Sequence, residues 1–173
     1  MKRIVWLMCL FAVSLNATAE LRLSLAAGER QLDIFRKEHP QQTDDAKFVG
    51  LAVGAYRELS ERWAAGAVVE GMYAISREQD IGSGRILGFR PVNLVTNAGW
   101  LRTEFYGGVA QYDWVKKAGG YYLGLHSSAP IASSDFSVGL DYKYFQDLAH
   151  DAVGGDYIVD GPALSLSISY KFD

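Results

Sequence analysis

Hydrophobic and polar residues alternate strictly at the end of the chain. From Ala163 to Asp173 the sequence reads ALSLSISYKFD, with apolar or aromatic residues at every second position and serines and a lysine between them. Successive side chains of a strand point to opposite faces of the sheet. This segment is therefore predicted to be a strand with one apolar and one polar face.

Seven further segments have strand character, which makes eight in all. The predicted strands are Leu21–Phe35, Lys47–Leu59, Trp63–Ile75, Arg85–Trp100, Thr103–Trp114, Gly120–Ala129, Asp135–Gln146 and Ala163–Phe172. The alternation changes phase near Gly28–Arg30 and again near Arg90-Pro91, and Gly and Pro within strands usually mark a bulge or bend. We expect an irregularity at both places. The fifth segment does not show which of its faces is apolar.

The connections between these segments differ in length. Residues 60–62, 101–102 and 132–134 form tight turns, whereas residues 36–46, 76–84 and 147–162 form longer polar connections, and 116–119 is a shorter member of that second set. Short turns on one side and long loops on the other are typical of outer-membrane barrels, with the short side in the periplasm. An even number of strands places both termini on that side.

The fold predicted from this pattern is all-β, an eight-stranded antiparallel up-and-down transmembrane β-barrel. A soluble barrel such as a lipocalin also alternates, but with its apolar face inward. The unequal connections favour the membrane barrel, and so do aromatic residues at strand ends, because aromatic rings prefer the headgroup level. These rings are Trp63, Trp100, Tyr170 and Phe172 at the periplasmic end, and Phe35, Tyr73, Trp114, Tyr121 and Tyr144 at the outer end.

The beginning of the chain reads as a secretory signal. Lys2 and Arg3 precede an apolar run from Ile4 to Leu15, and Ala17-Thr18-Ala19 fits a cleavage site. The apolar run is shorter than the roughly 20 residues of a membrane-spanning helix. We therefore expect residues 1–19 to be a cleaved signal peptide and residues 20–173 to be the outer-membrane barrel.

Composition excludes several classes of function. The only cysteine, Cys9, lies in the predicted signal, so the mature chain would have neither disulfides nor thiolate metal ligands. The formal net charge is −3 with no basic block, which argues against nucleic acid as a partner. The remaining length of about 150 residues suits a single domain.

The mature chain resembles the small eight-stranded outer-membrane barrels typified by OmpX and the membrane domain of OmpA. Its most specific part, Ser165–Phe172, is similar to the assembly signal that the barrel-insertion machinery reads, although such chains usually end on the aromatic residue and this one ends on Asp173. Asp160-Gly161-Pro162 also resembles a segment of YfaZ-like barrels. The resemblance implies the fold and location but leaves the activity open, because the group includes adhesion factors, structural proteins, narrow channels and lipid A enzymes.

Charged residues are predicted to point into the barrel. They are Arg22, Glu70, Arg90, Asp141 and Lys143, with Glu104 undecided. An eight-stranded barrel has room for side chains and little else, and charges there must pair or cost several kcal/mol. We expect a salt-bridged plug that contains Asp141 and Lys143 in one network. The alternative is a narrow path for ions or small solutes.

One pair of residues suggests catalysis. His126 and Ser128 lie two apart on one strand face, and with Asp141 they provide the residue types of a base, a nucleophile and an orienting acid. Lipid A deacylases carry a similar pair, but on the lipid-facing side and nearer the C-terminus. By parity His126 and Ser128 face the lumen, so polar lumen residues are the favoured interpretation and a lipid A-modifying hydrolase is the second alternative.

The polar connections add charges without a specific site. The last one carries Asp147, His150, Asp151, Asp156 and Asp160, whose spacing matches no calcium loop, and Arg36, Lys37, Arg77, Lys116 and Lys117 mark the outer rim. We predict a non-enzymatic protein with a structural or surface-interaction role, without catalytic residues, metal or cofactor. Its expected partners are outer-membrane lipid and lipopolysaccharide, periplasmic chaperones, the insertion machinery and an extracellular ligand bound through the outer loops.

Overall fold

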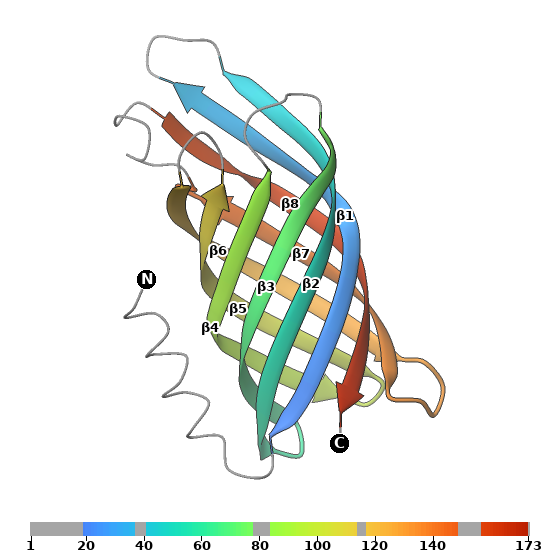
Figure 1. Cartoon of the computed structure of the whole chain (residues 1–173). Coiled ribbons are helices and arrows are strands. Elements are labelled where there is room, and N and C mark those ends of the chain that lie inside the picture. Colours follow the sequence, from blue (N-terminus) through green and yellow to red (C-terminus); the bar gives the residue numbers. More distant parts are fainter. Residues whose placement is uncertain (1–18, 37–40, 78–83, 114–116, 149–156, 173) are drawn as a thin grey trace.

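The chain forms a closed barrel of eight antiparallel strands in sequence order (Figure 1). The computed structural model describes residues 19–36, 41–77, 84–113, 117–148 and 157–172. The strands are β1 (Glu20–Arg36), β2 (Gln42–Ser60), β3 (Trp63–Arg77), β4 (Arg85–Ala98), β5 (Leu101–Asp113), β6 (Lys117–Pro130), β7 (Phe136–Gln146) and β8 (Tyr157–Phe172). Among the described residues, no helix has the length and apolarity needed to cross a membrane. The predicted fold class and strand number are confirmed.

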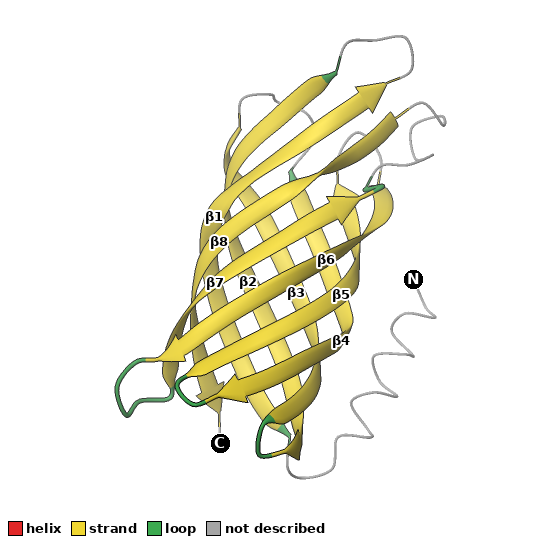
Figure 2. Cartoon of the chain, turned by 180° about the vertical axis from the view of Figure 1, so that it is seen from behind, coloured by secondary structure: helices red, strands yellow, loops and turns green. Residues whose placement is uncertain are grey.

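The amphipathic C-terminal strand closes the barrel. β8 pairs with β1 from Leu21↔Phe172 to Arg36↔Tyr157 and with β7 on its other side (Figure 2). Three short turns, at residues 61–62, 99–100 and 131–135, lie at the end where the described chain begins and stops. We refer to this end as the turn end and to the opposite end as the loop end. The connections at the loop end lie largely outside the described residues, so the predicted long loops stay a prediction.

The outside of the barrel is apolar. Exposed large hydrophobic side chains occupy alternate, outward positions on all eight strands, as Leu164, Leu166 and Ile168 do on β8. The predicted aromatic residues Trp63, Trp100, Phe172, Phe35, Tyr73, Tyr121 and Tyr144 are exposed, Tyr170 is half-buried, and Trp114 lies outside the described residues. The apolar face points outward, which contradicts the lipocalin-like arrangement and fits a barrel in lipid.

One of the two predicted irregularities is present and the other is absent. The register of β4 shifts between Phe89 and Val92, where Pro91 and Val92 both face outward, as expected for a bulge at Arg90-Pro91. β1 pairs with β2 without any shift. The predicted bulge at Gly28–Arg30 is therefore wrong. The change of pattern has another cause: beyond this point the inward positions are apolar, and they include Leu32 and Ile34.

Two strands, β2 and β8, continue five and six residues further at the loop end than the sequence predicts. β2 begins at Gln42 and β8 at Tyr157, so residues 42–46 and 157–162 are strand and not the predicted loop. Both strands are held by pairing with β1, up to Ile34↔Gln42 and Arg36↔Tyr157, whereas β3 joins β2 only from Arg77↔Ala46. The resulting sheet of residues 29–36, 42–47 and 157–162, which we call the outer extension, projects at the top of Figure 1.

The interior is packed in two apolar layers. The smaller, the turn-end core, contains Tyr56, Ala64, Val68 and Val95 with Ala52 packed against them. The larger, the loop-end core, contains Leu32, Ile34, Phe48, Met72, Ile86, Tyr106, Ala110, Tyr112, Tyr122, Phe145, Leu148, Val159 and Ala163. Charged side chains occupy the lumen beside this larger layer and on its turn-end side, and they form the candidate site.

Candidate functional site

Four charged residues form a cluster in the middle of the lumen. Glu70 on β3 accepts hydrogen bonds from Arg90 on β4, at 3.0 Å from Nε and 2.5 Å from Nη2, and from Lys143 Nζ on β7 at 2.6 Å. Lys143 Nζ also lies 3.2 Å from a carboxylate oxygen of Asp141. None of the four is more than 6 % exposed, so their charges are compensated by one another and not by solvent. We call this set the central ion cluster.

A tyrosine ring packs into this cluster. The Tyr106 hydroxyl donates to Asp141 Oδ1 at 2.6 Å, and the Arg90 guanidinium stacks 3.7 Å from the centre of the Tyr106 ring. The ring fits because the facing residue is Gly124, where a Cβ atom would lie 2.3 Å from the Tyr106 ring. The ring and its hydroxyl thus link strands β4, β5 and β7 across the lumen.

A second cluster lies nearer the turn end. Glu104 on β5 accepts hydrogen bonds from the Tyr56 hydroxyl at 2.9 Å and from Arg102 Nε at 3.0 Å. Arg102 Nη1 also lies 3.5 Å from Glu20, which in turn pairs with Arg22. We call these four charged residues, Glu20, Arg22, Arg102 and Glu104, the turn-end ion cluster. It shows that Glu104, undecided from the sequence, faces the lumen.

The two clusters are balanced in charge. The central cluster has two acids and two bases, and the turn-end cluster also has two of each. A third pair, Arg30 and Asp44, is fully buried near the loop end at 3.9 Å, and Arg30 Nη1 donates to the Gly84 carbonyl at 3.0 Å. Because every buried charge in the described strands has an opposite partner, these pairs offset the desolvation penalty of one another.

All five charges predicted to face inward lie in these clusters, and several of their partners were missed. Tyr56, Tyr106 and Arg102 carry much of the hydrogen bonding. The sequence offered weak signals for them: Arg102 falls in a predicted turn, and a tyrosine suits a membrane interface as well as a polar lumen. Asp141 and Lys143 do share one network, as predicted.

The candidate catalytic residues have other neighbours than those expected. His126 faces the lumen, with Nε2 3.2 Å from Ser167 Oγ on β8 and Nδ1 3.9 Å from Glu104. Asp141 lies opposite His126 in the register, but its carboxylate contacts Tyr106 and Lys143. Ser128 is buried in the same wall. The structure therefore places His126 beside Ser167 and Glu104, whereas the Asp141 carboxylate belongs to the central ion cluster.

A small cavity remains in the lumen between the described strands. It has a volume of about 50 Å³, bounded on one side by the charged clusters and on the other by small residues of β1, β2 and β8, among them Ala26, Gly50 and Ser167. A water molecule needs roughly 10–15 Å³ of such volume, so there is space for a few waters and not for an organic substrate. Toward the loop end, Phe48 and Met72 of the loop-end core bound this cavity.

The polar connections are described only in part. The Asp147 backbone amide donates to Asp160 Oδ1 at 2.7 Å, while His150, Asp151 and Asp156 lie outside the described residues. Of the predicted basic rim, Arg36, Arg77 and Lys117 fall at strand ends, and Lys37 and Lys116 lie outside the described part. Within the described ranges, no group of histidine and acidic side chains is arranged to hold a metal ion.

Comparison with known proteins identifies the architecture. No family model matches the sequence, and no curated protein matches it. Among solved structures, the chain is similar to Ail, the attachment invasion locus protein of Yersinia pestis, with a TM-score of 0.50 at 14 % identity over 90 % of this chain and 99 % of that one. Neisserial surface protein A aligns with a TM-score of 0.52 at 10 % identity over 89 % and 97 %.

These similarities concern the fold. The barrel has the architecture of the small eight-stranded bacterial outer-membrane barrels, in agreement with the resemblance carried by the sequence. Its apolar exterior is the surface that such a location requires.

Proposed function

We propose that this chain is a non-enzymatic outer-membrane barrel with a structural or surface-interaction role, whose lumen is plugged by its own side chains. The packing of the lumen supports this most directly. Two charge-balanced clusters fill its middle and turn end, and the loop-end core, including Phe145, Ile86 and Val159 at 0 % exposure, fills the rest. A barrel of this width is filled by side chains, so interaction is left to its ends and exterior.

The outer extension supports the surface role. It carries polar side chains on its outward face, including Glu29, Gln31 and Asp33, above the apolar belt. A rigid sheet that projects from the membrane can present a binding surface to the outside. Two barrels of similar fold carry names of this kind, the attachment invasion locus protein Ail and Neisserial surface protein A.

Conductance measurements separate this proposal from the narrow channel. We expect the purified barrel, inserted in a planar lipid bilayer, to give no discrete current steps at any voltage, because the loop-end core excludes water. Steps that disappear or change size in Glu70→Gln or Asp141→Asn would contradict the plug and favour the channel.

A lipid A-modifying hydrolase is the second alternative. It requires that cells expressing the protein show a changed lipid A mass, and that Ser128→Ala or Ser167→Ala restores the original mass. We expect the spectrum to be unchanged, because the cavity beside His126 has a volume of only about 50 Å³.

We also propose that residues 1–19 are a cleaved signal and that Phe172 and its strand direct assembly through the periplasmic chaperones and the insertion machinery. Residues 1–18 lie outside the described residues. We expect the protein recovered from outer membranes to have a mass that begins at Glu20, and Ala17→Leu with Ala19→Leu to retain the leader. A mass that includes Met1 in the wild type would contradict the cleavage.

A further inference from the structure

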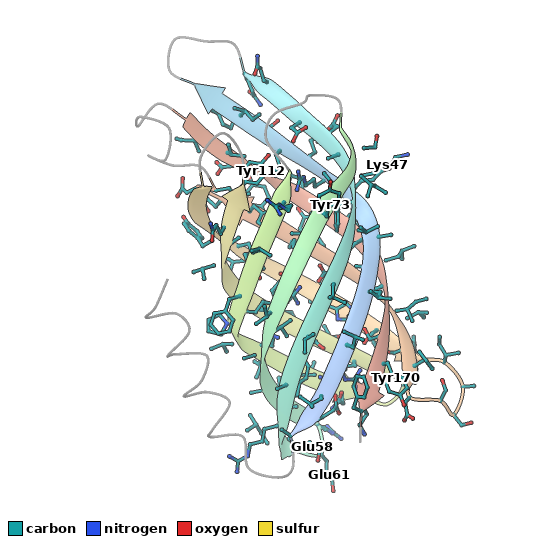
Figure 3. The ribbon with its side chains drawn as sticks, viewed as in Figure 1. Lys47, Glu58, Glu61, Tyr73, Tyr112 and Tyr170 are labelled. Atoms are coloured by element: carbon teal, nitrogen blue, oxygen red, sulfur yellow. The ribbon has the colours of Figure 1, made fainter. Side chains whose placement is uncertain are left out.

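A groove runs across the exterior of the barrel at the base of the outer extension. It has a volume of about 580 Å³, within the usual range for small-ligand sites. The side chains of Glu29, Gln31, Lys47, Ser76, Tyr142 and Leu164 line it, from strands β1, β2, β3, β7 and β8. All six are exposed, and Figure 3 shows Lys47 pointing away from the barrel.

Irregular pairing on two sides accounts for the hollow. The β1–β8 ladder is interrupted between Arg30↔Ala163 and Asp33↔Asp160, opposite Gly161-Pro162, since proline has no N–H to donate. Gly161 has φ +155°, and a Cβ atom there would lie 2.0 Å from the Gln31 carbonyl oxygen. On the other side, the β2–β3 register shifts between Lys47 and Phe48. Such irregularities bend a sheet.

The groove straddles the edge of the apolar belt. Toward the turn end, its neighbours on the outer face are Leu166, Val49 and Leu51, all strongly exposed hydrophobic residues. Toward the loop end, the outward positions Glu29, Gln31 and Asp33 of β1 are polar. A molecule lying in the groove would therefore meet apolar surface along one part of its length and hydrogen-bonding groups along the other.

The charge of the lining selects the polar part of the ligand. Glu29, Asp45 and Lys47 turn their side chains outward, whereas Arg30 is fully buried and pairs with Asp44 inside the barrel, so the formal charge of the outward lining is −1. Lys47 Nζ lies 3.9 Å from Glu29. A lining with this charge gives no electrostatic attraction for phosphate. Carboxylate, amide, ammonium and hydroxyl groups side by side suit a head group rich in hydroxyls, and the Tyr142 ring offers a face for the C–H side of a sugar.

We propose that this groove binds a glycolipid of the surrounding leaflet, with the sugar head at Glu29, Gln31 and Lys47 and the acyl chain along Leu164. This inference rests on the proposed outer-membrane location, which supplies the ligand. It assigns a binding role to the interruption of the β1–β8 ladder opposite Gly161-Pro162.

The probe is dodecyl maltoside, which joins a sugar head to one alkyl chain. It is titrated into the ¹⁵N-labelled barrel in dodecylphosphocholine micelles, whose detergent has the same chain length and no sugar. We expect the amide signals of Gln31, Lys47 and Leu164 to shift and saturate, and nuclear Overhauser contacts to link sugar protons to the Tyr142 ring. Gln111, exposed on β5, should show only the unsaturated drift of detergent mixing.

Matched variants test the assignment. Gln31→Leu should weaken the saturable binding about fivefold, which corresponds to the loss of one neutral hydrogen bond. Gln111→Leu is the control, because it removes the same exposed side chain elsewhere on the outer face, and it should leave binding unchanged. Equal, unsaturated shifts of the Gln31 and Gln111 amide signals would overturn the proposed binding in the groove. Equal weakening of binding by both variants would overturn it too. Nuclear Overhauser contacts between two barrels at the groove, without contacts to the sugar, would show that the groove binds a second copy of the chain. This result would also overturn the glycolipid proposal.

The location is tested separately by fractionation of cells. Saturable maltoside binding by a protein that is absent from the outer membrane would refute the location and leave the groove chemistry intact. A protein found in the outer membrane without saturable binding would refute the groove alone.

Discussion

The two halves of the lumen are filled by different kinds of side chain. Toward the turn end, charged residues, tyrosine hydroxyls and serines fill the space and leave a cavity of about 50 Å³. Toward the loop end, the larger apolar layer packs around Ile86, Phe145 and Val159, each at 0 % exposure. The first half depends on complementary charge and the second on complementary shape. One barrel therefore combines a polar network with a core like that of a soluble protein.

The loss of a charge in the central ion cluster should have the largest effect on stability. Glu70→Gln keeps the shape of the side chain but leaves Arg90 and Lys143 without their carboxylate, so we expect a loss of about 3–5 kcal/mol in the free energy of unfolding. Urea unfolding from phospholipid vesicles, followed by tryptophan fluorescence, measures it. Glu29→Gln is the control: its pair with Lys47 is exposed and should be worth under about 1 kcal/mol. Equal losses would show that the central cluster is solvated.

In the apolar half of the lumen, the corresponding test is to shorten a side chain of the loop-end core. Ile86→Ala should cost about 2–5 kcal/mol, because the removed atoms leave a space that neighbouring side chains fill only in part. Leu87→Ala is the matched control on the outer face, where Leu87 is 61 % exposed and lipid can fill the space. The same urea experiment should give a smaller loss for Leu87→Ala. If Ile86→Ala instead lowered the free energy of unfolding by less than Leu87→Ala, the loop-end core would be loosely packed.

The smallest effect is expected from a neutral hydrogen bond in the turn-end half. Ser24 Oγ on β1 and Ser169 Oγ on β8 lie 2.7 Å apart across the seam that closes the barrel. A double-mutant cycle with Ser24→Ala and Ser169→Ala should give a coupling energy of about 0.5–1.5 kcal/mol. Additive effects of the two substitutions would show that the hydroxyls do not interact.

The alternation of residues predicts which side chains point outward but not what the lumen contains. The strand number, the apolar exterior and the bulge at Arg90-Pro91 follow from period-two patterning and proline chemistry. The prediction for β1 was wrong because it assumed a polar lumen throughout. Leu32 and Ile34 point inward into the loop-end core, so the pattern reverses its polarity while the register of β1 with β2 stays unbroken.

Contacts across the barrel are beyond the reach of local pattern. The link from Tyr56 to Glu104 spans 48 residues, and the link from Lys143 to Glu70 spans 73. Both depend on register and barrel closure, which no single segment encodes. The start of β8 was missed for a similar reason: Gly161-Pro162 reads locally as a turn, but pairing with Asp33, Ile34 and Phe35 holds the segment as strand.

The most direct test of a closed barrel in the outer membrane is its gel mobility in that membrane fraction, boiled against unboiled in detergent. Closure through β1 and β8, together with the packed lumen, should keep the barrel folded until it is heated, so the unboiled protein should migrate at a different position. Identical mobility, with the protein recovered from the soluble periplasm, would contradict both the closed membrane barrel and its location.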